Sequence, residues 1–274
     1  MLTRIVSGIV GIIAAACIIQ AGGMVFAAAV VILGCIAWRE YMKAFAHKNV
    51  QLPSFLGFFM VVFIILSADQ SQNLMLPLIA AVFLSMIQMV FRHKSFSVEA
   101  ACITLAGVIY IGVPFYHLLA LRLLEDYRLV MPGTPVGDIS MGCALIWLTF
   151  IGTWASDTFA YFIGSAMGRH RLCPDISPKK SIEGFIGGII GTMLCMGALG
   201  AWLGFSLPVM LVLGAAVAVI GTLGDLVESC FKRYVGIKDS GTLIPGHGGV
   251  LDRFDSMMFT APLVYYTAVF LLIQ

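Results

Sequence analysis

The stretch GFIGGIIGTMLCMGALGAWL, residues 184–203, runs for twenty residues without one charged side chain. A helix needs roughly 20 apolar residues to span the hydrocarbon core of a bilayer. The apolar runs are continuous and lack the alternation of a membrane β-barrel. Similar runs recur along the chain, so we predict an all-α, polytopic integral membrane protein with nine spans, at about 5–21, 24–44, 54–68, 74–91, 99–121, 140–163, 184–203, 208–227 and 256–273.

The composition agrees with this fold class. The 274 residues are 60% hydrophobic and only 11% charged, whereas a soluble domain carries about 25% charged residues. The seven cysteines lie mostly in apolar runs and form no CxxC pair, which favours packing roles over disulfides or zinc. The N-terminus has features of a signal peptide, but a second apolar run follows almost at once, so we interpret it as an uncleaved first span.

The distribution of basic residues predicts the orientation. Fourteen of the sixteen Lys and Arg residues fall in connections on one side of the predicted membrane. By the positive-inside rule, the N-terminus is then cytoplasmic and the C-terminus lies outside. We treat residues 1–274 as a single transmembrane domain, with mainly apolar scaffold spans in 1–123. The spans in 140–274 carry the polar cytoplasmic loops, at 164–184 and 228–255, and are the candidates for a catalytic role.

Two features stand out in and after the sixth predicted span. A carboxylate inside a span is costly and marks a functional site by default, which singles out Asp157; a structural hydrogen bond to a neighbouring helix is the alternative. In SPKKSIEG, residues 177–184, Ser177 followed by Pro predicts a helix start. The helix N-terminus with Lys179 and Lys180 would then bind an anion, unless the lysines only flank the membrane.

The segment between the last two spans is the most polar part of the chain. Carboxylates spaced i, i+3 occur on both sides of it, Asp225 with Glu228 and Asp252 with Asp255. Such carboxylates, together with substrate phosphates, suit a hard cation such as Mg²⁺. Glycines let a backbone approach a phosphate closely. The other candidate site residues of this segment are Lys232, Arg233, Lys238, Asp239, Gly246, His247, Gly248, Gly249 and Arg253. A plain solvated loop is the alternative.

These residues carry a family resemblance. The run SCFKRYVGIKDSGTLIPGHGGVLDRFD, residues 229–255, resembles the signature of bacterial phosphatidate cytidylyltransferases, also called CDP-diacylglycerol synthases. SPKKSIEG and SDTFAYFIG are similar to the family's upstream motifs, whereas spans 1–5 resemble it only in being apolar. Two positions depart from the common pattern: Phe159 stands where Gly is usual, and Ser165 where Arg is usual.

The resemblance implies a reaction and a set of roles. CTP and phosphatidic acid would give CDP-diacylglycerol and pyrophosphate at the cytoplasmic face of the bacterial inner membrane. Asp225 and Asp252 would bind Mg²⁺, with Asp157, Glu228 and Asp255 as secondary candidates. Phosphate contacts would come from Ser177, Lys179, Lys180, Lys232, Arg233, Lys238, His247 and Arg253, while Asp239 would orient a lysine or bind cytidine. We expect no nucleic-acid partner, and the sequence leaves a homodimer open.

Two other functions stay open at this point. A related CTP-dependent membrane transferase, such as a polyprenol kinase, would use the γ-phosphate of CTP. An ion-coupled secondary transporter would place acids near the middle of the bilayer within repeated halves. The charges here crowd one predicted face and no repeat is visible, which favours the transferases.

Overall fold

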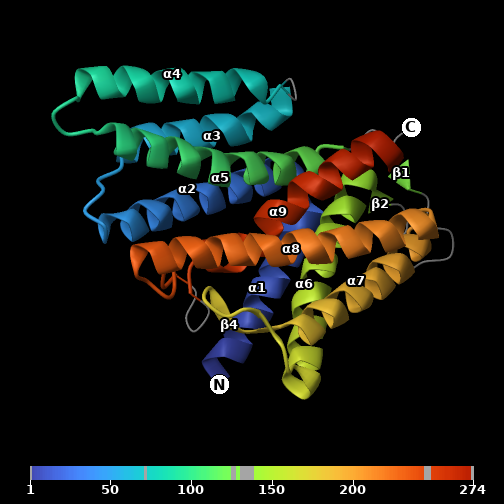
Figure 1. Cartoon of the computed structure of the whole chain (residues 1–274). Coiled ribbons are helices and arrows are strands. Elements are labelled where there is room, and N and C mark those ends of the chain that lie inside the picture. The colour runs from blue at the N-terminus through green and yellow to red at the C-terminus, as the bar shows by residue number, and fades with distance from the viewer. Residues whose placement is uncertain (1, 71–72, 125–127, 130–138, 244–247, 273–274) are drawn as a thin grey trace. The chain divides into compact units, whose positions relative to one another are not determined.

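A computed structural model describes residues 2–70, 73–124, 128–129, 139–243 and 248–272 (Figure 1). The described residues form nine α-helices and two short antiparallel strand pairs. The helices are α1 (Leu2–Ala21), α2 (Gly23–Ala46), α3 (Ser54–Gln70), α4 (Met75–Phe91), α5 (Val98–Arg122), α6 (Met141–Met167), α7 (Ile182–Trp202), α8 (Leu207–Val235) and α9 (Leu251–Thr267), the last continuing into a π-helical turn η1 (Ala268–Leu272). The strands are β1 (Arg128–Leu129), β2 (Ile139–Ser140), β3 (Arg171–Cys173) and β4 (Ser177–Ser181).

The helices confirm the all-α prediction, and each falls on one of the predicted apolar runs. Within the described part of the chain, five helices are long and apolar enough to cross a bilayer: α2, α5, α7, α8 and α9 with η1. Three shorter apolar helical stretches, Val6–Ala21, Ser54–Ala68 and Met75–Phe91, accompany them. The chain is therefore a multi-pass membrane protein.

The chain divides into two compact units. The first unit comprises residues 1–123 and 231–254, and its helices α2, α3 and α5 pack together with α4 alongside α3 and α5 (Figure 1). Small residues allow this close packing: Gly57 of α3 lies against the Trp38 ring, and Gly107 of α5 lies against the Tyr41 ring. A side chain at either glycine would collide with the aromatic ring, as is typical where membrane helices approach closely.

A buried arginine fixes the end of α1 within the first unit. Arg122 is 7% exposed, and its Nε donates a hydrogen bond to the Ile19 carbonyl at 3.1 Å. A cation at this position complements the partial negative charge at the C-terminus of α1. Gly22, with φ at +59°, lies directly against the guanidinium group, where any other residue would be both strained and crowded.

Aromatic contacts hold the segment 231–254 inside the first unit. At one end the Phe231 ring lies 5.3 Å from the Tyr110 ring and 6.3 Å from the Tyr41 ring. At the other end the Phe254 ring lies 5.7 Å from the Phe115 ring. The most polar segment of the sequence is thus attached at both ends to the apolar helices α2 and α5.

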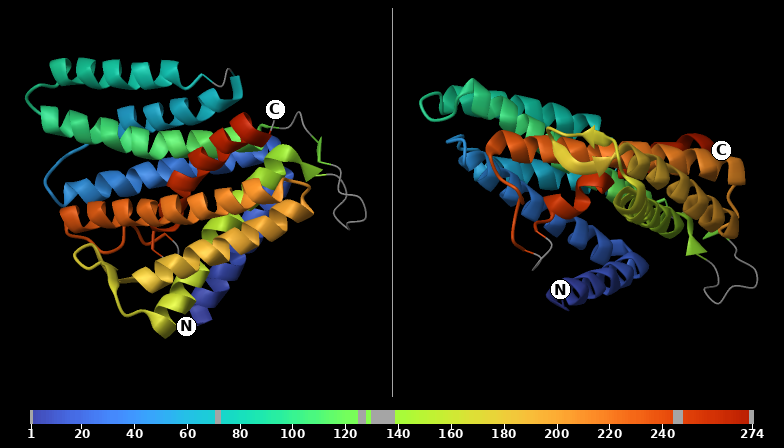
Figure 2. Two further views of the ribbon diagram at one scale, coloured as in Figure 1. Left: turned by 45° about the vertical axis from the view of Figure 1, so that its right-hand side comes forward. Right: turned by 60° about the horizontal axis from the view of Figure 1, so that its bottom comes forward.

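The second unit comprises residues 124–230 and 255–274, and its principal contact is between α6 and α7, which run side by side (Figure 2). Gly188 of α7 faces the backbone of Ser156, so the two helices approach closely. Within the same unit, α6 is joined to α9 by a hydrogen bond of 3.1 Å between the Thr153 and Thr260 hydroxyls.

Two local predictions were wrong. Residues Ser177–Ser181 form strand β4, paired with β3 in the register Arg171↔Ser181 and Cys173↔Ser177, and no helix starts at Ser177. The helix start lies at Ser181, whose hydroxyl accepts a hydrogen bond from the Gly184 amide at 3.1 Å. A serine followed by proline is compatible with either structure, because the φ that proline fixes also suits an extended chain.

The second correction concerns the polar loop predicted over 228–255. Helix α8 continues to Val235 and α9 starts at Leu251, so only the residues between them connect the helices. Helices can extend past the hydrocarbon core into water, where charged side chains no longer interrupt them. Lys232 and Arg233 therefore belong to the last turn of α8, and Asp252 belongs to the first turn of α9.

Candidate functional site

In the first unit, the Asp252 carboxylate connects three parts of the segment 231–254. Its Oδ1 accepts a hydrogen bond from Lys232 Nζ at 2.8 Å, and the side chain of Asp252 is only 6% exposed. Its Oδ2 accepts from the Ser240 amide, the Ser240 hydroxyl and the Gly249 amide, each at 2.8 Å. One carboxylate thus fixes the end of α8, both sides of the connection and the start of α9 relative to one another.

Glycines make this arrangement possible. Gly248 has φ at +88°, and a side chain there would meet the Asp252 carboxylate at 2.7 Å. A residue other than glycine would therefore be strained and would also push Asp252 away. Lys238, Asp239 and Arg253 have exposed side chains in the same segment. Gly246 and His247, which the sequence singled out, lie outside the described residues.

A residue that the sequence reasoning missed holds this segment in place. Glu40 of α2 is 6% exposed, and its two carboxylate oxygens accept hydrogen bonds from the Val250 and Leu251 amides, each at 3.0 Å. These amides begin α9 and have no partner within the helix, so the carboxylate caps α9 from a distant part of the chain. Gly241 and Gly249 both lie against the same carboxylate.

The second unit contains a pocket of about 640 Å³ at the ends of α6, α7 and α8 and at the β3–β4 hairpin. Four of the residues predicted for the site line it: Asp157, Lys179, Lys180 and Asp225. Tyr161, one helical turn after Asp157, lines it too. The structure thus brings together residues that are up to 68 positions apart in the sequence, by adjacent placement of the two carboxylate-bearing helices and the lysine-bearing strand.

Lys180 and Asp225 form an ion pair in this pocket. Lys180 Nζ lies 2.7 Å from Asp225 Oδ2, and both side chains are about a quarter exposed, at 26% and 27%. The Ser229 hydroxyl donates to Asp225 Oδ1 at 3.3 Å. Because the pair is open to the pocket, both groups can exchange partners when a charged ligand enters.

Glu183 fixes the turn beside the pocket. Its carboxylate accepts hydrogen bonds from the Arg169 amide at 3.0 Å and the His170 amide at 3.2 Å, and it lies 2.6 Å from His170 Nδ1. Residue 183 stands in the first turn of α7, so its charge also suits the positive end of that helix. This clamp joins the end of α6 to the start of α7.

The two departures from the family pattern have local counterparts. The Phe159 ring lies against Gly191 of α7, where the missing side chain leaves it room. Ser165 lines the pocket and donates to the Phe162 carbonyl at 3.0 Å. Arg171, on the neighbouring strand β3, lines the same pocket and supplies a guanidinium group to it. Arg171 has no signal in the sequence, because only the β3–β4 hairpin brings it to the pocket.

The remaining acidic candidates have different surroundings. Glu228 is 2% exposed, so it differs from Asp225 although the two are three residues apart on α8. Asp255 Oδ1 accepts a hydrogen bond from the Ser256 amide at 2.6 Å. Among the described residues, no three His, Cys, Asp or Glu side chains are grouped closely enough to hold a metal ion by themselves.

Comparison with known proteins agrees with the motifs. A sequence model of the cytidylyltransferase family matches residues 2–271. The chain belongs to this family. It is 35% identical to a phosphatidate cytidylyltransferase of Staphylococcus haemolyticus over 96% of this chain and 97% of that protein. The corresponding proteins of Bacillus subtilis and Staphylococcus aureus are 33% and 36% identical, covering 97% and 96% of this chain and 97% of each relative. The predicted resemblance is thereby confirmed, and it extends over the apolar helices as well as the motifs.

Proposed function

We propose that the protein transfers the cytidylyl group of CTP to phosphatidic acid, giving CDP-diacylglycerol and pyrophosphate. Membership of the cytidylyltransferase family over nearly the whole chain supports the reaction type, and the names of the bacterial relatives support the substrates. The observation that carries the proposal is the Lys232–Asp252 pair with its Ser240 and Gly249 donors, because it lies inside the motif that carries the resemblance.

The chemistry makes limited demands on the protein. An oxygen of the phosphatidate phosphate attacks the α-phosphorus of CTP, and the bond to the bridging oxygen of the leaving pyrophosphate breaks. The nucleophile is already anionic, so no strong general base is needed. The difficulty is to bring two polyanions together and to neutralise the charge that develops on pyrophosphate, which positioned cations can do.

The proposed roles follow the two clusters. Lys179, Lys180 and Arg171 would neutralise phosphate groups in the pocket of the second unit. Lys232, Arg233, Lys238 and Arg253 would do so in the first unit, with His247 as a further donor. Ser177 and the glycines Gly246, Gly248 and Gly249 would contribute polar or backbone contacts, and Asp239 would orient a lysine or bind cytidine.

Magnesium is proposed as the cofactor, with Asp225 and Asp252 as its ligands and Asp157, Glu228 and Asp255 as secondary candidates. Mg²⁺ is usually held by one or two carboxylates together with substrate phosphates, so a complete protein cage is not required. Both proposed ligands already bind a cation, since Lys180 lies against Asp225 and Lys232 against Asp252. The Asp225 carboxylate, which is open to its pocket, fits a hard cation that competes with Lys180, whereas Asp252 would have to exchange Lys232 for the cation. The cation would supply charge neutralisation at the phosphates.

The membrane arrangement belongs to the same proposal. Nine spans, a cytoplasmic N-terminus and an external C-terminus would place the candidate residues at the cytoplasmic face of the bacterial inner membrane. The excess of Lys and Arg in alternate connections supports this orientation. A cytoplasmic site is also what the substrates require, because CTP is soluble and phosphatidic acid lies in the bilayer.

Product analysis distinguishes this reaction from that of a CTP-dependent lipid kinase. The purified protein would be given CTP, Mg²⁺ and phosphatidic acid, and the soluble products would be separated by ion exchange. Cytidylyl transfer releases pyrophosphate in amounts equal to the CDP-diacylglycerol formed. Release of CDP, with a phosphate added to the lipid, would instead identify a kinase and overturn the proposal.

A further inference from the structure

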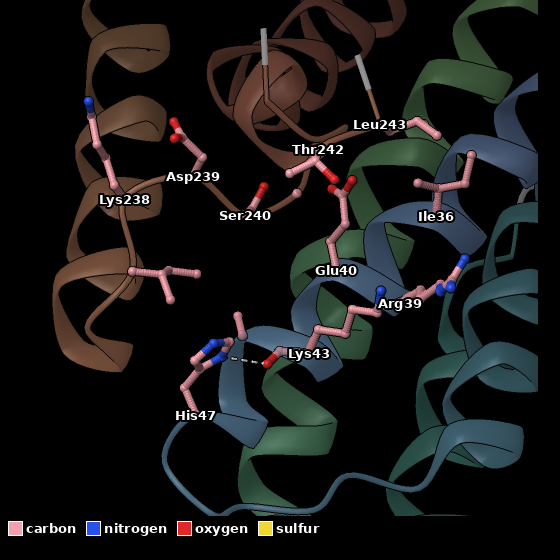
Figure 3. Close-up of a pocket in the computed structure, with 13 residues that line it drawn as sticks. Ile36, Arg39, Glu40, Lys43, His47, Lys238, Asp239, Ser240, Thr242 and Leu243 are labelled. Carbon is pink, nitrogen blue, oxygen red and sulfur yellow. Dashed lines mark hydrogen bonds between the residues drawn. The ribbon is translucent and has the colours of Figure 1, made fainter. Parts of the chain in front are cut away.

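The first unit also contains a cavity, of about 750 Å³. It lies between the C-terminal part of α2 and residues 237–243 (Figure 3). Lys238 and Asp239 lie on one side of it, and Arg39, Glu40 and Lys43 of α2 lie on the other. Neither the family motifs nor the composition assigned a role to this part of α2, which the sequence placed in the apolar scaffold.

The α2 side of the cavity is a row of basic side chains. Arg39, Lys43 and His47 are spaced four residues apart, so they lie on one face along the end of the helix. All three are exposed and line the cavity. Among the described residues, neither Arg39 nor Lys43 forms an ion pair. Like charges at this spacing destabilise a helix, a cost that an anion in the cavity would offset.

The acidic residues in the lining do not cancel this row. Both Glu40 oxygens accept hydrogen bonds from the Val250 and Leu251 amides, which are stronger partners of the carboxylate than Lys43, although Lys43 also interacts with it electrostatically. Asp239 is the other acid, and it lies on the opposite wall with Lys238. The His47 ring donates through Nδ1 to the Lys43 carbonyl at 2.9 Å, which holds the ring at the end of the row (Figure 3).

We infer that Arg39 and Lys43 of α2 and His47, directly after the helix, form with Lys238 a binding site for the phosphate groups of a substrate. The inference rests on the proposed cytidylyl transfer and adds a wall from α2 to its binding residues. A planar guanidinium and a compact ammonium at adjacent turns match a chain of phosphates or a phosphate monoester. Nucleotide and lipid headgroup share this chemistry, and the experiment separates them.

The test uses the full-length protein in detergent with Arg39→Gln, Lys43→Gln and the double variant. Lys94→Gln is the matched control, because Lys94 is an exposed lysine of the same unit outside the cavity. Pyrophosphate binding, measured by isothermal titration calorimetry without lipid, should weaken about tenfold for each charge removed. The control should stay within about twofold of the wild type, as expected for a surface charge that contacts no ligand.

Steady-state kinetics then identify the natural ligand. A rise in the KM for CTP alone assigns the site to the nucleotide, and a rise in the KM for phosphatidic acid alone assigns it to the lipid phosphate. If the double variant keeps wild-type affinity for pyrophosphate and both KM values, α2 binds no phosphate and the inference is overturned. If the wild type shows no transfer but the double variant still loses pyrophosphate affinity, the proposed reaction fails while the phosphate site stands.

Discussion

Glu40 offers the sharpest test of how the candidate site is held together. Its carboxylate accepts the Val250 and Leu251 amides at 3.0 Å each, and only 6% of the residue is exposed. Replacing Glu40 by Gln preserves the size of the side chain but leaves only one acceptor oxygen. The NH2 of the glutamine amide then faces one of the two backbone N–H donors. Replacing it by Ala removes both acceptors.

The expected loss follows from these two bonds. A hydrogen bond to a charged group contributes about 1.5–3 kcal/mol, so Glu40→Gln should cost about that much. Glu40→Ala should cost about 3–5 kcal/mol, the range for removing one partner of a buried charged interaction. At about 2 °C per kcal/mol for a chain of this size, the unfolding midpoint should fall by about 3–6 °C and 6–10 °C, respectively.

Hydrogen exchange shows whether the loss is local. In Glu40→Gln, the amides of Val250 and Leu251 should exchange about ten- to a hundredfold faster, because each 1.4 kcal/mol is a factor of ten. Peptides from α3 should be unchanged. Glu99→Gln is the matched control, since Glu99 is an exposed acid in the first turn of α5, where such a charge contributes at most about 1 kcal/mol.

The transfer reaction should respond with the same variants. If Glu40 positions the segment that contains Asp252, kcat for transfer should fall in Glu40→Gln at temperatures where the protein is fully folded, whereas Glu99→Gln should keep the wild-type value. Unchanged exchange at residues 250 and 251 together with an unchanged midpoint would refute the capping role.

Three further perturbations follow from the described contacts. Gly22→Ala should destabilise the protein by about 1–3 kcal/mol in thermal unfolding, because φ is +59° and the new methyl group meets the Arg122 guanidinium. The control is Gly11→Ala, which has open space around it and should be neutral or slightly stabilising. Glu183→Gln should raise exchange at residues 169–170 and lower transfer about three- to tenfold, since two backbone donors lose a charged acceptor; unchanged exchange would contradict the clamp. Chelation with EDTA should abolish transfer, and added Mg²⁺ should restore it. Asp225→Asn should require at least about tenfold more Mg²⁺ for the same activity. Full activity in EDTA would contradict a role for the metal.

The helices could be predicted because their signal is local. An apolar run of sufficient length is enough to mark a membrane helix, and the predicted span 24–44 corresponds to the helix Gly23–Ala46. The boundaries were wrong where charged residues extend a helix beyond the apolar run, as in α8. They were also wrong at Ser177, where pairing with Arg171–Cys173 decides between two local structures that the same residues allow.

The candidate site was predictable as a set of residues but not as a set of contacts. The motif identified Asp252 and Lys232, whereas their bond and the Ser240 donors depend on how the connection between α8 and α9 folds back. The role of Glu40 could not be predicted from the sequence at all. Its partners lie 210 and 211 positions away, and a single acid near the basic end of an apolar helix carries no local pattern.

Transfer of label from CTP to lipid is the decisive measurement for cytidylyl transfer by this protein. Protein purified in detergent would be incubated with Mg²⁺, phosphatidic acid and CTP labelled at the α-phosphate, and the lipid phase would be counted for the wild type and for Asp252→Asn. We expect label in the lipid with the wild type and a fall of about a hundredfold or more in the variant, since cation and metal contacts at the phosphates supply several kcal/mol. Label that stays in the aqueous phase with wild-type protein, under conditions where a phosphatidate cytidylyltransferase relative is active, would contradict it.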